Sequence, residues 1–314
     1  MNRRLKGSIQ MTITALIWGL TFVAQSVAMD NIGPWTFNCL RNVLGTLVLI
    51  PVILFVEKLE TEKLVNKGAQ DTIPATSLKR PAVLKQTLIG GCLSGIFLAS
   101  ASLFQQYGII ETTVGKAGFI TALYIILVPF LSIFLKKRIG LNEWVSAFIA
   151  VAGFYIMSIQ GKPSINRGDI ILLICALLFS MQILVIDSYV DRVNTIAMSC
   201  VQFFVSMVIS SIGMFFIEHP SGEAIISAAF PIIWAGVMSS GIAYTLQIVG
   251  QKNLEPTIAS LIMSLESVFS AIAGFFILHQ ILSTKEIIGC ILVFSAVILS
   301  QIPPETIKKL IKKA

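Results

Sequence analysis

The chain has 314 residues, of which 55% are hydrophobic and only 12% are charged, and its formal net charge is +7. A soluble domain usually has about 25% charged residues, so the composition excludes a soluble domain as the main part of the chain. Positive charge alone would suggest a nucleic-acid partner, but the placement of the basic residues indicates a membrane instead.

Ten apolar segments follow one another along the chain. About 20 apolar residues in a helix cross the hydrocarbon core of a bilayer, and most segments reach that length. The longest connection, 57–85, is charged and contains Gly68, Pro74 and Pro81, as a flexible cytoplasmic loop would. The sequence therefore predicts an all-α integral membrane protein that contacts the lipid bilayer and no nucleic acid. Its ten transmembrane helices are placed at 8–28, 35–56, 86–106, 114–135, 142–160, 168–187, 195–217, 229–249, 257–278 and 285–302.

The basic residues are divided unevenly between the two sides of such a bundle. The side with both termini receives 18 of the 23 Lys and Arg residues and the other side receives four, while Arg41 falls within a segment. Because cytoplasmic loops are enriched in Lys and Arg, we expect a multi-pass protein of a bacterial plasma membrane with both termini in the cytoplasm. The basic C-terminal tail would then lie against anionic lipid headgroups.

The first segment has a polar stripe on one helical face. Its members are spaced by three or four residues, which places them one above another on a helix: Gln10, Thr14, Trp18, Thr21 and Gln25. In lipid, polar groups must face protein or a water-filled cavity. Trp18, Thr21 and Gln25 are therefore candidates to line a substrate site, and a dry contact between helices is the alternative.

The second segment carries Arg41, and the third carries the small pair Gly91 and Gly95, which we interpret as a helix-packing surface. For Arg41 there are two interpretations. Its long side chain can extend to the outer membrane surface, or it can belong to an internal site, since ionisable groups inside a membrane are functional candidates. In the fourth segment Tyr124 is a candidate pocket residue, and Pro129 predicts a bend.

The seventh segment has a stripe that we interpret mainly as helix packing, formed by Thr195, Ser199, Gln202, Ser206 and Ser210. In the eighth segment, Tyr244 and Gln247 are further candidate pocket residues.

The ninth segment holds Glu266, the one ionisable residue between Pro256 and Leu278. A charge at the centre of a membrane helix costs about 2.5–3.5 kcal/mol on insertion scales, so something must compensate for it. We expect Glu266 to face a central cavity, with nearby serine hydroxyls, Ser264 among them, lowering the cost. The alternative is a permanently protonated Glu266 that makes a structural hydrogen bond. The arc that Glu266 shares with serines comprises Ser260, Ser264, Ser267 and Ser270.

The sequence also repeats. Residues 7–57 align without a gap on 168–218, and residues 105–158 align on 247–300. Two repeats are therefore predicted, 1–160 and 161–314, each with five helices. An odd number of helices per half makes the second half inverted in the membrane, as in many secondary transporters. In this alignment Arg41 corresponds to Gln202, and Glu266 corresponds to Tyr124, so the charges are not duplicated. The first segment matches an internal one, so we expect it to belong to the fold and not to be a cleaved signal.

Several stretches resemble the EamA-type members of the drug/metabolite transporter superfamily. They are ALIWGLTFV (15–23), RN (41–42), FQQYGIIETTVGKAGFITALYIILVPFLSIFL (104–135) and LESVFSAIAGFFILHQILSTKEIIG (265–289). The resemblance covers nearly the whole chain. It implies a ten-helix transporter of small metabolites, often amino acids.

Function is accordingly predicted as secondary transport of a small metabolite, an amino acid or similar amphipathic compound, across the cytoplasmic membrane by alternating access, with proton coupling or exchange as an option. A membrane sensor or scaffold without transport is the alternative. An enzyme is not expected, because the sequence lacks catalytic and phosphate-binding motifs. No cofactor is expected, and the five cysteines have no metal-ligand spacing. The predicted substrate-binding residues are Trp18, Thr21, Gln25, Arg41, Tyr124, Tyr244, Ser264 and Glu266.

Overall fold

The computed structural model describes residues 2–65, 74, 76–112, 114–137, 139–158, 166–277 and 283–302, and in these ranges the chain forms helices and no strand. Eight rods are long and apolar enough to cross a membrane, and two apolar helices, α6 (Leu141–Ser158) and α14 (Thr284–Gln301), are shorter. All ten predicted segments coincide with helices. The basic residues 308–313, the loop residues 66–73 and the end of the ninth predicted segment, Leu278, lie outside the described residues.

Five of the eight long rods are single α-helices or an α-helix with a short π-helical end. They are α1 (Arg3–Met29), α2 (Pro34–Val65), α3 (Pro81–Glu111), α7 (Arg167–Tyr189), and α8 (Thr195–Gly213) continued by η1 (Met214–Glu218). The other three are composite: α4 (Val114–Thr121) with α5 (Tyr124–Phe134), α10 (Ala229–Ile233) with η2 (Trp234–Tyr244) and α11 (Thr245–Gln251), and α12 (Pro256–Met263) with α13 (Leu265–Ile277). The short α9 (Gly222–Ser227) precedes α10.

Local sequence explains where the helices begin. Proline, whose missing N–H costs nothing in the first turn of a helix, opens α2, α3 and α12. Asn166 starts α7 with a capping box, in which its side chain accepts from the Asp169 backbone N–H at 2.9 Å and Asp169 accepts from the Asn166 backbone N–H at 2.9 Å. Asn194 caps α8 by accepting from the Ala197 N–H at 3.0 Å.

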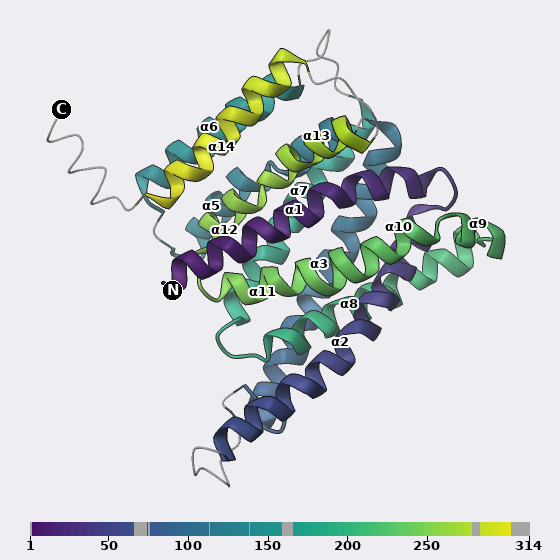
Figure 1. Cartoon of the computed structure of the whole chain (residues 1–314), viewed down its shortest axis with the longest axis vertical. Coiled ribbons are helices and arrows are strands. Elements are labelled where there is room, and N and C mark those ends of the chain that lie inside the picture. The colour runs from purple at the N-terminus through teal and green to yellow at the C-terminus, as the bar shows by residue number, and fades with distance from the viewer. Residues whose placement is uncertain are drawn as a thin grey trace, which may run out of the picture.

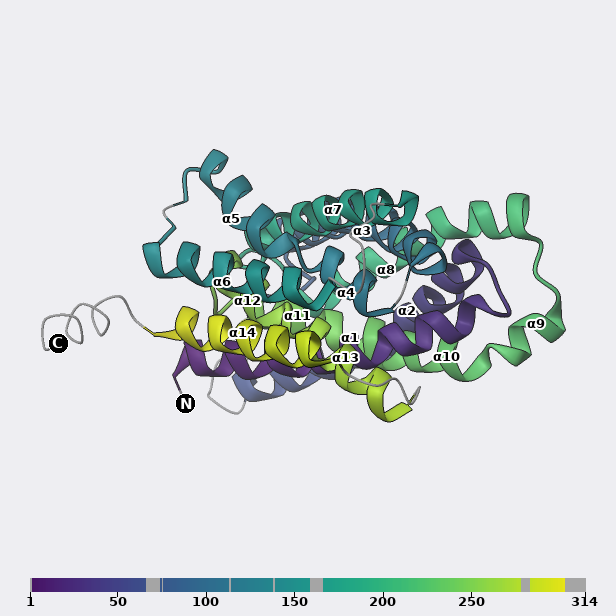
Figure 2. The ribbon, with the colours of Figure 1, turned by 90° about the horizontal axis from the view of Figure 1, so that it is seen from above.

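The helices pack as two layers (Figures 1 and 2). Seen from above, α3 and α7 lie in one layer and α1, α13 and α14 in the other, while α6 and α14 pair at one edge of the bundle. The helix α3 packs against α7 and α8, and α1 packs against α13 and η2. The start of α1 and the end of α14 lie together, because Arg4 Nη2 donates to the Ser300 carbonyl at 2.9 Å. We call this the terminal end of the bundle.

Glycines allow close contacts between helices. A Cβ on Gly91 would lie 2.6 Å from the Val201 side chain, and one on Gly95 would lie 2.8 Å from the Gln202 backbone oxygen, both on α8. The predicted packing role of this pair is therefore confirmed. The seventh-segment stripe also makes contacts between helices: Asn42 Nδ2 donates to Ser206 Oγ at 2.8 Å.

Two rods are interrupted in mid-course. The α4–α5 rod breaks at Ala122 and Leu123, and the α12–α13 rod breaks at Ser264. The helix α5 runs through Pro129, where a bend is predicted, and the interruption of the rod precedes that proline.

Polarity is arranged as in a membrane protein. Large apolar side chains cover the outer surface, for example Phe134, which is 72% exposed, and Phe216, which is 78% exposed. Polar side chains are buried instead, and they include Gln105, Gln182, Gln202 and Gln247. In water this distribution would be unfavourable, whereas in lipid it leaves each polar group facing protein or an internal cavity.

Candidate functional site

A cavity lies between the two layers, with about 430 Å³ of space not occupied by atoms, part of which is open to solvent. Residues from α1, α2, α3, α7 and the three composite rods line it. Of the eight predicted substrate-binding residues, the structure brings seven together around this cavity: Trp18, Thr21, Gln25, Arg41, Tyr124, Tyr244 and Glu266. Ser264 is fully buried but does not line the cavity.

Glu266 lies in the first turn of α13, and its partner comes from the other interrupted rod. Tyr124, the first residue of α5, donates its hydroxyl hydrogen to Glu266 Oε1 at 2.9 Å. Tyr124 is 2% exposed and Glu266 is 4% exposed. Partial positive charge at the start of a helix favours a nearby anion, so the start of α13 and the tyrosine hydroxyl both favour the carboxylate oxygens.

The serines of the ninth segment do not solvate Glu266, contrary to expectation. Ser260, Ser264 and Ser267 donate to the carbonyls of Thr257, Leu261 and Ser264 at 2.8, 2.7 and 2.6 Å. Each hydroxyl therefore bonds to its own helix three residues back. Serine in an apolar helix commonly satisfies its hydroxyl in this way, which is why a shared arc of polar residues does not establish a shared site.

Arg41 extends from α2 into the same cavity and is only 2% exposed. Its guanidinium lies near the Tyr244 side chain, and its Cζ lies 5.8 Å from the centre of the Phe37 ring. Nε and Nη1 are buried without a hydrogen-bond partner. Since the side chain does not reach the bundle surface, the structure favours the internal-site interpretation over extension to the membrane surface.

Arg41 and Glu266 do not pair directly. Among the described residues, the salt bridges are Lys58–Glu62 and Lys137–Asp187, and none joins the two cavity charges. Tyr244 is close enough to interact with both. The cavity thus holds one basic and one acidic group with a tyrosine near both of them, and each charge remains available for another group.

An aromatic wall stands beside Arg41. The Trp18 and Tyr244 rings lie with their centres 4.6 Å apart at 55°, and Phe203 meets Tyr244 edge-on at 5.7 Å. Offset and tilted aromatic pairs of this kind contribute about 0.5–1.5 kcal/mol beyond their buried area. The wall is therefore a preformed apolar surface beside charged groups, which suits an amphipathic ligand.

Side-chain amides complete the polar lining. Gln25 Nε2 donates to Gln105 Oε1 at 3.1 Å, and Gln182 and Gln247 exchange hydrogen bonds at 3.2 and 3.4 Å. Thr21 accepts from Trp234 Nε1 at 3.2 Å. Thr14, also in the predicted stripe, instead donates to the Ala243 carbonyl at 3.1 Å and lies in a helix contact.

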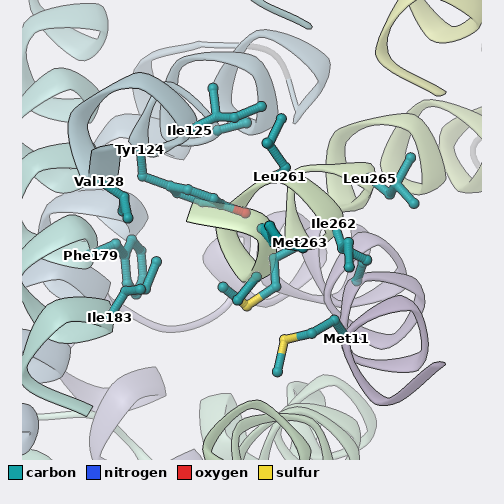
Figure 3. Close-up of a cluster of buried hydrophobic side chains, with 14 of the residues drawn as sticks. Met11, Tyr124, Ile125, Val128, Phe179, Ile183, Leu261, Ile262, Met263 and Leu265 are labelled. Carbon is teal, nitrogen blue, oxygen red and sulfur yellow. The ribbon is translucent and has the colours of Figure 1, made fainter. Parts of the chain in front are cut away.

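Toward the terminal end, apolar side chains close the space next to the cavity. Met11 lies on α1 closer to that end than Trp18, and Val128 lies closer to it on α5 than Tyr124. Together with Ile183, Leu261 and Met263 they form one buried cluster (Figure 3). An ion pair between Lys137, which follows α5, and Asp187 on α7 joins the helices at this same end. The cavity is therefore separated from the terminal end by packed apolar groups.

Comparison with known proteins decides the family. The sequence matches the EamA-like transporter family over residues 5–159 and again over residues 166–301. The chain belongs to the EamA-like transporter family. This family is part of the drug/metabolite transporter superfamily, and the chain is a multi-pass membrane protein.

Two curated relatives match this EamA-like protein over most of their length. An uncharacterized transporter of Archaeoglobus fulgidus is 28% identical over 298 residues, which cover 95% of this chain and 86% of the relative. The uncharacterized transporter YoaV of Bacillus subtilis is 23% identical over 300 residues, covering 93% and 94%. A solved crystal structure with 16% identity superimposes with a TM-score of 0.72 over 94% of this chain and 96% of its own, which shows the shared fold.

Sequence reasoning missed part of the lining of this EamA-like protein. Glutamine in an apolar segment was a usable signal for Gln105 and Gln182, whereas the aromatic and aliphatic lining residues have no sequence signal that separates them from core. The described part of the chain has no group of three His, Cys, Asp or Glu residues that could hold a metal ion. The missed lining residues are Phe22, Gln105, Thr121, Phe179, Gln182, Ile183 and Ser239.

Proposed function

We propose that the protein is a secondary transporter that moves a small amphipathic metabolite, such as an amino acid, across the cytoplasmic membrane by alternating access. One observation carries the proposal: a buried cavity between the two layers holds an arginine with unpaired nitrogens, a carboxyl and an aromatic wall. Because buried polar groups without partners are costly, a sensor or scaffold would have no reason to keep them.

The helix contacts support ten transmembrane helices in two inverted repeats. Exchanging each helix for its repeat partner turns the α3–α7 contact into the contact of the α10–η2–α11 rod with α1, and the α3–α8 contact into the η2–α2 contact. The α2–α8 and α6–α14 pairs each join equivalent helices. The two rod interruptions fall at equivalent positions as well, since Thr121 aligns with Met263.

The Tyr124–Glu266 hydrogen bond supports the same arrangement. These residues occupy equivalent positions of the two repeats and touch each other, and a contact between equivalent positions lies on the axis that relates the halves. Inverted-repeat transporters carry substrate and coupling ions at this interface, near interrupted helices. We therefore assign Glu266 as the group that gains and loses a proton during the cycle.

Uptake into proteoliposomes tests transport. Purified protein is reconstituted and supplied with radiolabelled pools of amino acids and of other small metabolites, and accumulation should exceed that of protein-free vesicles for at least one pool. Absence of flux for every pool, with protein that is folded and inserted, would support a sensor or scaffold instead.

Glu266→Gln tests the proton step. Glutamine keeps the shape and the hydrogen-bond acceptor but cannot ionise, so the variant should fold and lose pH-dependent transport. A wild-type rate and pH profile in Glu266→Gln would mean that the carboxyl has no part in the cycle. The matched control is Gln182→Glu, which adds a carboxyl to the same cavity at a residue that hydrogen-bonds to Gln247, and it should not restore coupling when combined with Glu266→Gln.

Cysteine labelling tests the orientation, in which both termini are cytoplasmic. In a background without the five native cysteines, an impermeant maleimide added outside cells should modify a cysteine placed at Gly222 and spare one at Gln70 or at the C-terminus. The reverse pattern would overturn the orientation without affecting the transport proposal.

A further inference from the structure

Arg41 is a buried cation with an incomplete set of partners. A guanidinium stays protonated in proteins and offers five N–H donors. Here Nε and Nη1 are buried and unpaired, and the residue is 2% exposed. An uncompensated buried charge is strongly destabilising, so the resting state of the cavity leaves a strong demand for an anion at this position.

The groups around Arg41 do not meet that demand. Tyr244 lies near the guanidinium, and Phe37 offers the face of its ring at 5.8 Å. A cation–π contact contributes about 0.5–2 kcal/mol and accepts no N–H hydrogen bond in the plane of the guanidinium. Glu266, the carboxylate among the residues that line the cavity, is hydrogen-bonded to Tyr124 and forms no ion pair with Arg41.

We infer that Arg41 binds a carboxylate of the transported molecule, so that the substrates of this protein are carboxylic acids and the amines or amides derived from them are excluded. The inference rests on the proposed function and names its substrate class. A planar carboxylate matches the guanidinium donors better than a spherical ion does. The Trp18–Tyr244 wall beside Arg41 then receives the apolar part of the molecule.

The chemistry of the site also predicts which analogues of the substrate it rejects. A site built to hydrogen-bond one polar group rejects analogues that lack it, because its own buried groups are then left unpaired. An amide or ester in place of the carboxylate would leave Arg41 charged and uncompensated. Removing the carboxylate is therefore expected to weaken binding by a factor of about 100 or more, in line with charge-assisted hydrogen bonds.

Ligand-induced stabilisation of the purified full-length protein tests the inference. Melting temperatures are measured in nanodiscs with a library of α-amino acids, hydroxy acids and aliphatic monocarboxylates, each beside its carboxamide and its decarboxylated amine. A ligand that binds the folded state raises the melting temperature by mass action. At least one carboxylate should stabilise the wild type, and its amide and amine partners should not.

Three variants separate the role of Arg41 from general charge. Arg41→Gln should lose stabilisation by the carboxylate, and Arg41→Lys should retain part of it. Lys58→Gln removes a cation whose side chain is 75% exposed, away from the cavity, and should bind as the wild type does. Tyr244→Phe, which keeps the guanidinium and removes the neighbouring hydroxyl, serves as a second cavity variant should Arg41→Gln fail to fold, and it should retain the preference for the carboxylate over its amide.

The outcomes are distinct. Equal stabilisation by a carboxylate and its amide, unchanged binding in Arg41→Gln, or no carboxylate effect in the whole library would each overturn the inference. Stabilisation by chloride or phosphate alone, with no further effect of carboxylates, would assign Arg41 to an inorganic anion and overturn it as well. Uptake of an amine or amide would support the transport function and refute the role of Arg41 as a carboxylate-binding group. Carboxylate binding without uptake would support that role of Arg41 and contradict the transport function.

Discussion

The hydrogen bond between Tyr124 and Glu266 gives the sharpest stability test. Tyr124→Phe removes one oxygen atom and leaves Glu266 Oε1, formerly bonded at 2.9 Å, without that partner in a buried site. Net contributions of hydrogen bonds are about 0.5–1.5 kcal/mol between neutral groups and about 1.5–3 kcal/mol when one group is charged. Tyr124→Phe should therefore lower the free energy of unfolding by about 1–3 kcal/mol.

A double-mutant cycle identifies the form of Glu266 in the resting state. In the Glu266→Gln background the acceptor is a neutral amide oxygen, so Tyr124→Phe should cost about 1 kcal/mol. If Glu266 is charged, the two substitutions couple by about 1–2 kcal/mol. If it is protonated, the coupling falls to a few tenths of a kcal/mol, and the cost of Tyr124→Phe then rises toward high pH.

The assay is reversible unfolding in detergent–SDS mixtures, followed by circular dichroism. The matched control is Tyr155→Phe on α6, where the tyrosine is 60% exposed, and it should change stability by less than about 0.5 kcal/mol. The reasoning is refuted if Tyr124→Phe costs no more than Tyr155→Phe, because the contact between Tyr124 and Glu266 would then contribute nothing to stability.

Three further predictions follow from other contacts. Trp18→Ala removes the ring that packs at a tilt against Tyr244 and should lower the rate of proteoliposome uptake in a protein that still inserts, whereas unchanged kinetics would place Trp18 in a dry helix contact. A Cβ on Gly213 would lie 1.9 Å from Trp35 Cδ2, so Gly213→Ala should lower the free energy of unfolding by about 1–3 kcal/mol in the same assay. A Cβ on Gly222 would meet no atom within 4 Å, so Gly222→Ala should leave stability nearly unchanged. Equal losses of stability in the two variants would contradict the close contact between Gly213 and Trp35. Lys137→Gln breaks the ion pair with Asp187 and should speed alkylation of the buried Cys175 by a maleimide. Exchanging the two charges, with Lys137→Asp and Asp187→Lys, should restore the slow rate. An unchanged rate in Lys137→Gln would mean that the ion pair does not hold the terminal end closed.

Much of the fold could be predicted from the sequence because the bilayer imposes a simple rule. A segment must be apolar and about 20 residues long to cross, and the segments predicted on that basis all coincide with helices. Periodicity also identified which face of α1 carries Trp18, Thr21 and Gln25. It could not show that Thr14, on the same face, bonds to the Ala243 carbonyl, because the stripe does not reveal which helix lies opposite each turn.

The candidate site was predicted in its charged and aromatic members and less well elsewhere. Arg41 and Glu266 stand out because a charge in an apolar segment is costly and therefore conspicuous. The prediction that serine hydroxyls lower the cost of Glu266 was wrong, since a hydroxyl can bond to the backbone of its own helix, as Ser264 does to the Leu261 carbonyl. The partner of Glu266 is Tyr124, with which it aligns in the predicted sequence repeat, and no periodicity within one segment can reveal a contact between two segments.

The interruptions at Ala122 and Ser264 have a mechanical consequence. An unbroken helix transmits a tilt along its whole length, whereas a rod that is interrupted in the middle can bend there. The two interruptions lie in antiparallel rods, with α5 beside α12 and α4 beside α13. In the proposed alternating-access cycle, the α5–α12 pair at the terminal end would swing apart while the α4–α13 pair keeps its place, so that the cavity would open toward one side at a time.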